Sequence, residues 1–248
     1  MITRPWEVQG LKACLFDFGG TLDADGVTWQ DRFFELYRRH GLEVDRELFR
    51  NAFYHADDHL IETRALGGAG FEETITAQVA GVCEVLGLED SCEPMRLIIR
   101  DFIESTQRLI RRNRPLLSEL QGRFRLGIVS NFYGNLERVC DDLAIRDYFP
   151  CMIDSTCEGV MKPDPKIFQA ALDRLDVKPG EAVYVGDNPF RDMEGARAIG
   201  MPHVRLIGAD RRRPETCCPG DPVIHSLEEL VPLLTEGKGG DGPDGGTS

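Results

Sequence analysis

The 248-residue sequence has no long apolar run and little positive charge. No stretch approaches the roughly 18 residues of a membrane-spanning helix, and residues 1–10 lack the apolar segment of a secretory signal peptide. Lys and Arg number 29 against 42 Asp and Glu, which leaves a net charge of −13. Because a field of this sign repels nucleic acid and anionic membranes, we expect a cytoplasmic protein that binds neither.

Cysteine pairs with metal-binding spacing are also missing. The eight cysteines include no CxxC pair and are scattered along the chain, which favours reduced thiols over a zinc or disulfide framework. Only the adjacent Cys217 and Cys218, in a polar segment, are candidates for reactive thiols. Hydrophobic residues at 42% and charged residues at 29% are close to the globular average, so a folded protein with a sizeable core is expected.

Short β-branched and aromatic runs alternate with helical patterns along much of the chain. The expected strands cover residues 13–18, 124–129, 152–154, 182–185, 203–207 and 223–225. Helical patterns at 136–143, 167–175 and 190–199 lie between them. Alternation of this kind predicts an α/β fold, a doubly wound parallel sheet covered by helices on both faces, in which ligands bind at the carboxyl ends of the strands.

One interval breaks the alternation, because about 105 residues separate the first two expected strands. It contains four amphipathic stretches, at residues 30–40, 45–65, 71–86 and 94–112, which are separated by glycines. We therefore expect an all-helical cap at residues 25–112, inserted into a core of residues 11–24 and 113–235 and standing over the strand ends as a mobile lid. The polar, Gly-rich tail at 236–248 is expected to be disordered.

Four polar segments follow the ends of expected strands. They are Asp17-Phe18-Gly19-Gly20-Thr21, Ser130-Asn131, Lys162-Pro163 and Asp187-Asn188-Pro189-Phe190-Arg191-Asp192. In a parallel sheet they would converge on one edge. There Asp17 and Asp187 would repel each other unless a hard cation lay between them, and oxygen ligands at that reach suit Mg²⁺. Lys162 and the Ser130 hydroxyl could then hold a phosphoryl group while Asp17 attacks it to form an aspartyl-phosphate.

The order of these segments resembles the haloacid dehalogenase (HAD) superfamily, and in particular its phosphatase branch with a helical cap inserted after the first motif. The resemblance covers roughly residues 11–235 and implies a Rossmann-like core. It also implies that Asp17 is the nucleophile and that Ser130 and Lys162 bind phosphate. Asn131, through its backbone amide, and Thr21 are further candidate phosphate contacts.

The same resemblance implies the composition of the metal site. The Mg²⁺ ligands would be Asp17, the main-chain carbonyl of Gly19, and Asp187, with Asp192 orienting the site or binding a metal-bound water. Gly19 departs from the pattern, because phosphatases of this superfamily usually have an Asp two residues after the nucleophile. That Asp protonates the leaving oxygen and then activates the attacking water.

The substitution at Gly19 predicts slow turnover on alkyl phosphates, since general acid–base assistance is worth about 10² to 10⁴ in rate. Three hypotheses follow. Asp23 or Asp25 in the next loop replaces the missing acid, the substrate has a good leaving group such as an acyl phosphate, or catalysis has been lost.

These observations predict a Mg²⁺-dependent phosphatase that acts on a small phosphorylated metabolite. One alternative is a catalytically silent phosphate-binding or scaffold protein of the same superfamily. Another is a metal-free 2-haloacid dehalogenase, although such enzymes usually have Tyr at the position of Gly19 and have little use for a carboxylate at Asp187. The sequence does not identify the substrate and does not distinguish a monomer from a homodimer.

His55 and His59 lie four residues apart on an expected cap helix, with Asp57 and Asp58 between them. The spacing is that of a zinc-binding pair, but no third ligand accompanies it. We expect a solvated or cleft-facing helix surface, which could contribute to substrate selection.

Overall fold

The computed structural model describes residues 10–88, 93–208 and 221–235, and a parallel sheet lies at its centre. Six strands follow the spatial order β3-β2-β1-β4-β5-β6. They are β1 (Ala13–Phe16), β2 (Arg125–Ser130), β3 (Cys151–Asp154), β4 (Ala182–Gly186), β5 (His203–Leu206) and β6 (Val223–Ile224). Every neighbouring pair runs parallel, so all the carboxyl ends lie along one edge. The expected α/β fold is confirmed.

The strand order changes direction between β1 and β4. From β1 the chain moves outward through β2 to β3, whereas from β4 it moves to the other side through β5 and β6. Strands β1 and β4 are direct neighbours, with Phe16 opposite Val185. In an open parallel sheet the crevice at such a reversal is where ligands bind. Asp17 and Asp187 follow these two strands, so the topology brings both to that crevice.

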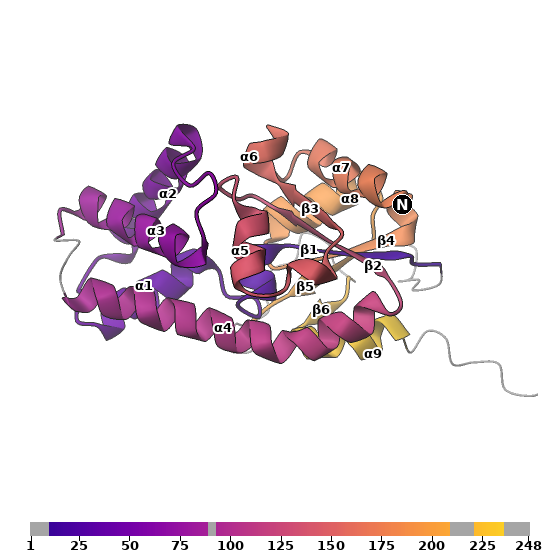
Figure 1. Cartoon of the computed structure of the whole chain (residues 1–248), viewed down its shortest axis with the longest axis horizontal. Helices are drawn as coiled ribbons and strands as arrows, with labels where there is room; N and C mark the ends of the chain where they lie inside the picture. Colours follow the sequence, from indigo (N-terminus) through magenta and orange to yellow (C-terminus); the bar gives the residue numbers. More distant parts are fainter. Residues whose placement is uncertain (1–9, 89–92, 209–220, 236–248) are drawn as a thin grey trace, which may run out of the picture.

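Each face of the sheet has its own apolar cluster, because successive side chains of a strand point to opposite faces. Leu15 belongs to the cluster that includes α7 (Pro165–Leu175). Phe16 belongs to the larger cluster, which takes in α5 (Leu136–Asp142) and α9 (Leu230–Thr235). Figure 1 shows α7 and α8 (Gly195–Ala198) on one side of the sheet and α9 on the other.

Helices fill the long interval between β1 and β2. They are α1 (Trp29–Arg39), α2 (Arg46–Thr63), α3 (Phe71–Leu86) and α4 (Glu93–Gln121). Polar side chains start the first two, because Thr28 accepts the backbone N–H of Asp31 in α1 and Asp45 accepts N–H groups at the start of α2. Figure 1 shows these helices to one side of the sheet.

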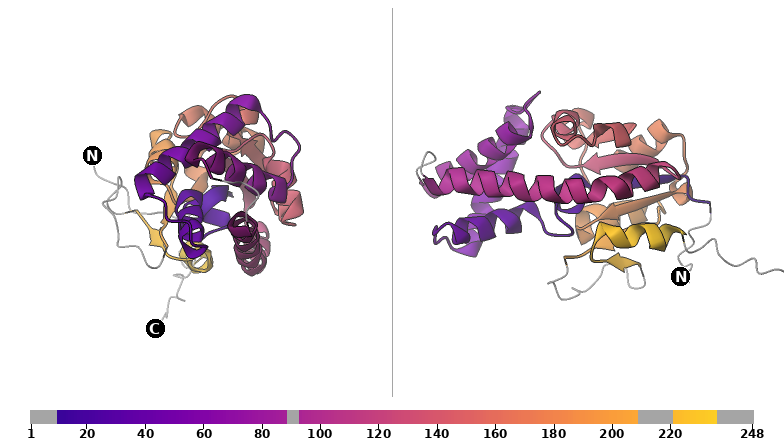
Figure 2. Two further views of the ribbon diagram at one scale, coloured as in Figure 1. Left: turned by 90° about the vertical axis from the view of Figure 1, so that its left-hand side faces the viewer. Right: turned by 60° about the horizontal axis from the view of Figure 1, so that its bottom comes forward.

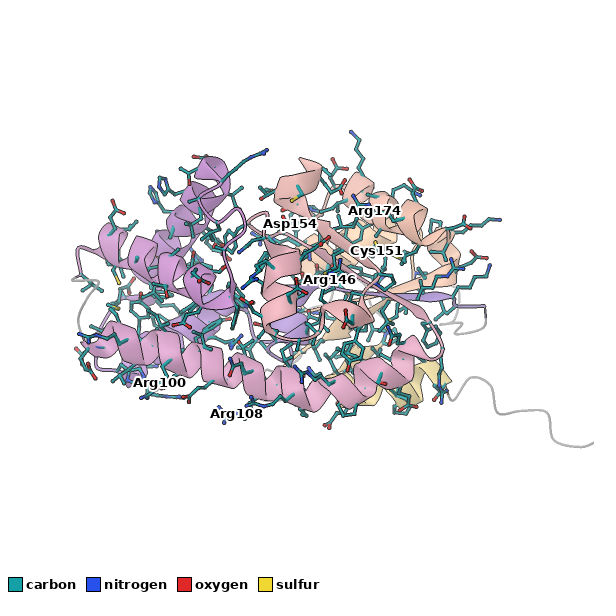
Figure 3. The ribbon with its side chains drawn as sticks, in the orientation of Figure 1. Arg100, Arg108, Arg146, Cys151, Asp154 and Arg174 are labelled. Atoms are coloured by element: carbon teal, nitrogen blue, oxygen red, sulfur yellow. The ribbon has the colours of Figure 1, made fainter. Side chains whose placement is uncertain are left out.

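Helix α4 joins the two parts of the molecule. It contributes Phe102 to the helical part and Leu117 to the packing against the sheet, and Figure 2 shows it extending along both. Arg100 and Arg108 project to solvent from its outer side (Figure 3). The boundary expected at residue 112 therefore falls inside a continuous helix, since apolar spacing on one helix face continues across it.

The segment expected as one helix at 190–199 is divided. It forms a wide turn at Pro189–Glu194 and then the short α8. In the turn, the N–H of Met193 reaches the carbonyl of Asn188 five residues back, and such widened turns occur often at functional sites.

Two further sequence expectations concern the ends of the chain and the membrane. The tail at 236–248, expected to be disordered, and the pair Cys217 and Cys218 lie outside the described residues. Within the described ranges, no helix combines the length and the apolar character needed to cross a lipid bilayer.

Candidate active site

Asp17 extends β1 by one residue at the carboxyl edge of the sheet. Its backbone N–H donates to the carbonyl of Val185 in β4 at 2.9 Å, so the strand pairing holds its main chain in place. Its Oδ1 accepts the Ser130 hydroxyl at 2.8 Å and lies 2.7 Å from Nζ of Lys162. Three residues far apart in the chain therefore meet at one carboxylate oxygen, as the strand-end argument predicted.

Lys162 is a buried cation held by oxygen atoms. Its Nζ lies 2.7 Å from Oδ1 of Asp17, 2.7 Å from Oδ1 of Asp192 and 3.0 Å from the hydroxyl of Tyr184. Burial alone would lower the pKa of this ammonium, but the two carboxylates outweigh burial and raise the pKa above its ordinary value. Lys162 therefore stays charged. Its main chain is held by Asn131, whose side chain accepts the Lys162 N–H at 2.7 Å.

Asp187, at the end of β4, completes an acidic cluster. Ligand oxygens of Asp17, Asp187 and Asp192 all lie within 4.8 Å of one another. Burial raises the pKa of Asp187 well above its ordinary value, and the neighbouring Asp192 and Asp17 raise it further. Carboxylates this close oppose one another's ionisation, and a hard divalent cation with oxygen ligands would relieve the repulsion. The residues present therefore fit a divalent metal site.

Asp192 differs from the other two carboxylates because both of its oxygens are engaged. Oδ1 accepts from Lys162, and Oδ2 accepts the backbone N–H of Asn188 at 2.9 Å. The widened turn of residues 189–194 places it there. This arrangement suits a residue that positions Lys162 and the 187–192 loop.

Two glycines shape the loop after Asp17. Gly20 has φ of +95°, and a Cβ atom built on it would lie 2.8 Å from Oδ2 of Asp187, so only glycine fits beside the cluster. Gly19 occupies the position where an acid is expected, and a Cβ there would lie 3.3 Å from Nε1 of Trp29. The indole of the cap therefore borders the space that a side chain at residue 19 would enter.

The hypothesis that Asp23 or Asp25 replaces the missing acid does not match the structure. Asp23 is fully buried, and its carboxylate accepts a main-chain N–H of its own loop, the indole N–H of Trp29 and the guanidinium of Arg32, each at 2.7 Å. Asp25 is paired with Arg112 at 2.6 Å. Neither residue lines the cavity above Asp17, because both carboxylates attach the loop to the helices of the cap.

A cavity of about 110 Å³ lies above the cluster, between the strand ends and the helices of the cap. Its floor comes from the core, and its opposite wall comes from α1 and α2. Its lining includes Asp17, Ser130, Lys162, Asp187, Trp29, Phe53, Tyr54, Asp57, Tyr133 and Arg191. The site is therefore a pocket between the strand ends and helices α1 and α2.

Some predicted residues lie elsewhere, and some cavity residues were not predicted. Thr21 is fully buried and donates to Oδ1 of Asp187 at 3.4 Å, so it supports the carboxylate and does not line the cavity. His55 does not line it either, whereas Asp57 does. The sequence did not indicate that Tyr184 contacts Lys162, because an aromatic residue inside an apolar strand is typical of the core. Arg191 lies inside a predicted motif, but its sequence position alone does not show that it lines the cavity.

Comparisons with known proteins identify the family of this chain. A family model described as haloacid dehalogenase-like hydrolase matches residues 11–200. The chain is 30% identical over 208 residues to the human "Haloacid dehalogenase-like hydrolase domain-containing protein 3", covering 79% of this chain and 83% of that protein. It is 38% identical over 104 residues to a glyceraldehyde 3-phosphate phosphatase of Pyrococcus furiosus, covering 40% of this chain and 42% of the relative.

Solved structures share the fold. A HAD phosphatase from Thermococcus onnurineus aligns with a TM-score of 0.54 at 24% identity, covering 91% of this chain and 98% of that one. The L-2-haloacid dehalogenase from Xanthobacter autotrophicus, with chloropropionic acid covalently bound, aligns with a TM-score of 0.57 at 19% identity, covering 90% and 98%. The match to the family model and the similarity to the human relative together show that the chain belongs to the haloacid dehalogenase-like hydrolases.

Proposed function

We propose that this hydrolase is a Mg²⁺-dependent phosphatase that acts on a small phosphorylated metabolite through an aspartyl-phosphate on Asp17. The main observation in support of the proposal is that the Asp17 carboxylate contacts an ammonium and a hydroxyl, both of which can bind phosphate oxygens. Lys162 and Ser130 lie 2.7 Å and 2.8 Å from Oδ1 of Asp17. A phosphoryl group placed against Asp17 would therefore be within reach of an ammonium and a hydroxyl.

The metal would be held by the side chains of Asp17 and Asp187, with the main-chain carbonyl of Gly19 as a third ligand and Asp192 as a positioning residue. When bound there, Mg²⁺ supplies positive charge that offsets the carboxylates and polarises the phosphoryl oxygens. Oxygen ligands and high negative charge are the donor set that this ion prefers. The raised pKa of Asp187, caused by burial and by its acidic neighbours, is consistent with a site built for a cation.

The chain's own residues account for the first chemical step. The carboxylate of Asp17 attacks phosphorus in line with the leaving oxygen, while Lys162 and Ser130 hold the oxygens that do not react. Both are almost fully buried, at 3% and 2% exposure, so they need little reorganisation as charge moves. Water then attacks the aspartyl-phosphate and restores Asp17.

The acidic cluster favours phosphoryl transfer over halide displacement. A metal-free dehalogenase would have no use for Asp187, whose ionisation the neighbouring carboxylates oppose. The resemblance of residues in this chain to a named phosphatase, at 38% identity over 104 residues, points the same way. The fold alone does not separate the two reactions, since solved structures of both kinds share it.

A screen of phosphorylated metabolites and p-nitrophenyl phosphate tests the proposal, with and without Mg²⁺. We expect phosphate release that disappears with EDTA and in Asp17→Asn, which preserves the shape of the side chain but removes the nucleophile. Activity that survives EDTA, or chloride release from 2-chloropropionate, would contradict the phosphatase assignment. A failure to release phosphate from any ester would favour a catalytically silent protein.

A further inference from the structure

The proposed mechanism leaves the proton of the leaving group without a donor. Position 19 is a glycine bordered by Trp29. The nearby Asp23 and Asp25 do not line the cavity and are paired with Arg32 and Arg112. An alkoxide is a poor leaving group, so hydrolysis of an alkyl phosphate needs an acid within reach of the leaving oxygen. In an in-line attack the leaving oxygen points away from Asp17, so an acid that protonates it would lie on the cavity wall opposite Asp17.

Asp57 is the carboxyl group that the cap places on this wall. It lies on α2 together with Phe53 and Tyr54, and residues four apart share a helix face, so these side chains line the cavity together. Among the cavity-lining residues that the structure describes in the cap, Asp57 is the only one with a titratable carboxyl group. It is half-buried, whereas the neighbouring Asp58 is exposed and does not line the cavity.

The core holds Asp57 in place through Tyr133. The phenol of Tyr133, which also lines the cavity, donates a hydrogen bond to Oδ1 of Asp57. Asp154, labelled at the end of β3 in Figure 3, fixes the loop that carries Tyr133 by accepting the N–H of Gly134 at 2.9 Å. A cap carboxyl and a rigid core loop therefore meet across the cavity.

The surroundings of Asp57 keep part of its population protonated near neutral pH. Burial is the main cause that raises the pKa of this carboxyl, and the charge of Asp58 raises it too. The hydrogen bonds of Tyr133 and Gln78 and the charge of Arg191 lower it, and the net result is a pKa of about 7. Burial also raises the pKa of Tyr133 well above its ordinary value. The phenol therefore stays neutral while the carboxyl titrates.

We propose that Asp57 is the general acid and base of this active site, supplied by the cap in place of a side chain at residue 19. As the bond from phosphorus to the leaving oxygen breaks, that oxygen takes the proton of Asp57 and departs as an alcohol. The Asp57 carboxylate then accepts a proton from the water that attacks phosphorus. The phosphorus–Asp17 bond breaks, phosphate is released and both side chains return to their starting states. This inference rests on the proposed phosphatase function.

The dependence of rate on the leaving group tests the inference. We compare kcat/KM for p-nitrophenyl phosphate, whose leaving group departs without protonation, with kcat/KM for glycerol phosphate, whose leaving group needs a proton. Asp57→Asn should lower the value for glycerol phosphate by about 10² to 10⁴ and retain most of the value for p-nitrophenyl phosphate. A loss of kcat/KM that is larger for glycerol phosphate than for p-nitrophenyl phosphate reports lost proton donation, because misfolding would lower both values equally. A thermal melt checks the folding of the variant separately.

The pH profile gives a second readout. Because the acid must be protonated, kcat/KM of the wild type for glycerol phosphate should fall as pH rises through about 7, the pKa of Asp57. Asp57→Asn should remove this fall. Tyr133→Phe deletes a hydrogen bond that stabilises the ionised carboxyl, so it should move the fall to higher pH. The matched control is Asp58→Asn, one residue away on α2, which should keep the wild-type ratio between the two esters.

Three results would overturn the inference. They are an equal loss on both esters in Asp57→Asn, no loss on either, and a wild type that hydrolyses only p-nitrophenyl phosphate. Each of these leaves the phosphatase proposal standing. A wild type without activity on any phosphate ester would instead contradict the proposed function, and the inference with it.

Discussion

Replacing Lys162 by methionine tests whether the acidic cluster depends on one buried cation. The Lys162 side chain is 2% exposed, and its Nζ lies 2.7 Å from both Asp17 and Asp192. Methionine has a similar length and no charge, so the substitution leaves three neighbouring carboxylates without their cation. Removing one partner of a buried ion pair typically costs about 3 to 5 kcal/mol, because the remaining charge stays buried.

The matched control is Lys12→Met, at an ion pair of the same length but on the surface. Lys12 lies 2.7 Å from Glu181, and its side chain is 59% exposed. Solvent screens such a pair, so little or no change in the free energy of unfolding is expected. Urea denaturation of both variants without metal measures the two losses in free energy of unfolding. Since the substitution and the distance between the charged atoms are the same at both sites, a difference between the losses comes from burial.

The free energy of unfolding of Lys162→Met should also depend on pH, and the direction of that dependence can be predicted. Burial holds the pKa values of Asp187 and Asp192 above their ordinary values and Lys162 lowers them, so without Lys162 both rise further above those of the unfolded chain. The folded variant then binds more protons than the unfolded one, so its stability increases as pH falls. A Lys162→Met protein that loses no more stability than Lys12→Met, or whose deficit is the same at pH 5 and pH 8, would refute the reasoning.

Three further predictions concern the loop and the metal. Gly20→Ala places a Cβ atom on a backbone with φ of +95° and 2.8 Å from Oδ2 of Asp187. Calorimetry should therefore show a loss of Mg²⁺ binding, and a folded variant that binds Mg²⁺ normally would contradict this prediction. Asp23→Asn leaves the half-buried Arg32 without its carboxylate partner and should lower the free energy of unfolding by about 3 to 5 kcal/mol, as measured by urea denaturation. A changed ratio of the rates on p-nitrophenyl phosphate and glycerol phosphate would instead give Asp23 a chemical role. Mg²⁺ should raise the melting temperature of the wild type but not that of Asp187→Asn, and equal shifts would place the ion elsewhere.

The sequence predicted the sheet and the floor of the site because both depend on local patterns. Apolar runs that end in a polar residue mark strands, and parallel strands bring their carboxyl ends to one edge. Asp17, Ser130 and Lys162 meet for this reason. The absence of an acid at Gly19 was also evident from the sequence, because the position can be identified by counting two residues from Asp17.

The sequence could not show which neighbouring side chains were already engaged. Asp23, Asp25 and Thr21 follow Asp17 closely in the chain, yet in the folded protein they pair with Arg32, Arg112 and Asp187. A residue's position in the chain gives its distance from the motif along the backbone but not the direction of its side chain. The expected cap boundary at residue 112 lies inside α4, which continues to Gln121.

The meeting of Asp17, Ser130 and Lys162 and the absence of an acid at position 19 followed from the sequence alone, because residue type and strand-end position determine them. Which side chains of α1 and α2 line the cavity followed only from the tertiary structure. Asp57 and Tyr133 lie 76 residues apart, on a helix of the cap and a loop of the core. Their contact depends on how those two parts pack, and no local pattern encodes that packing.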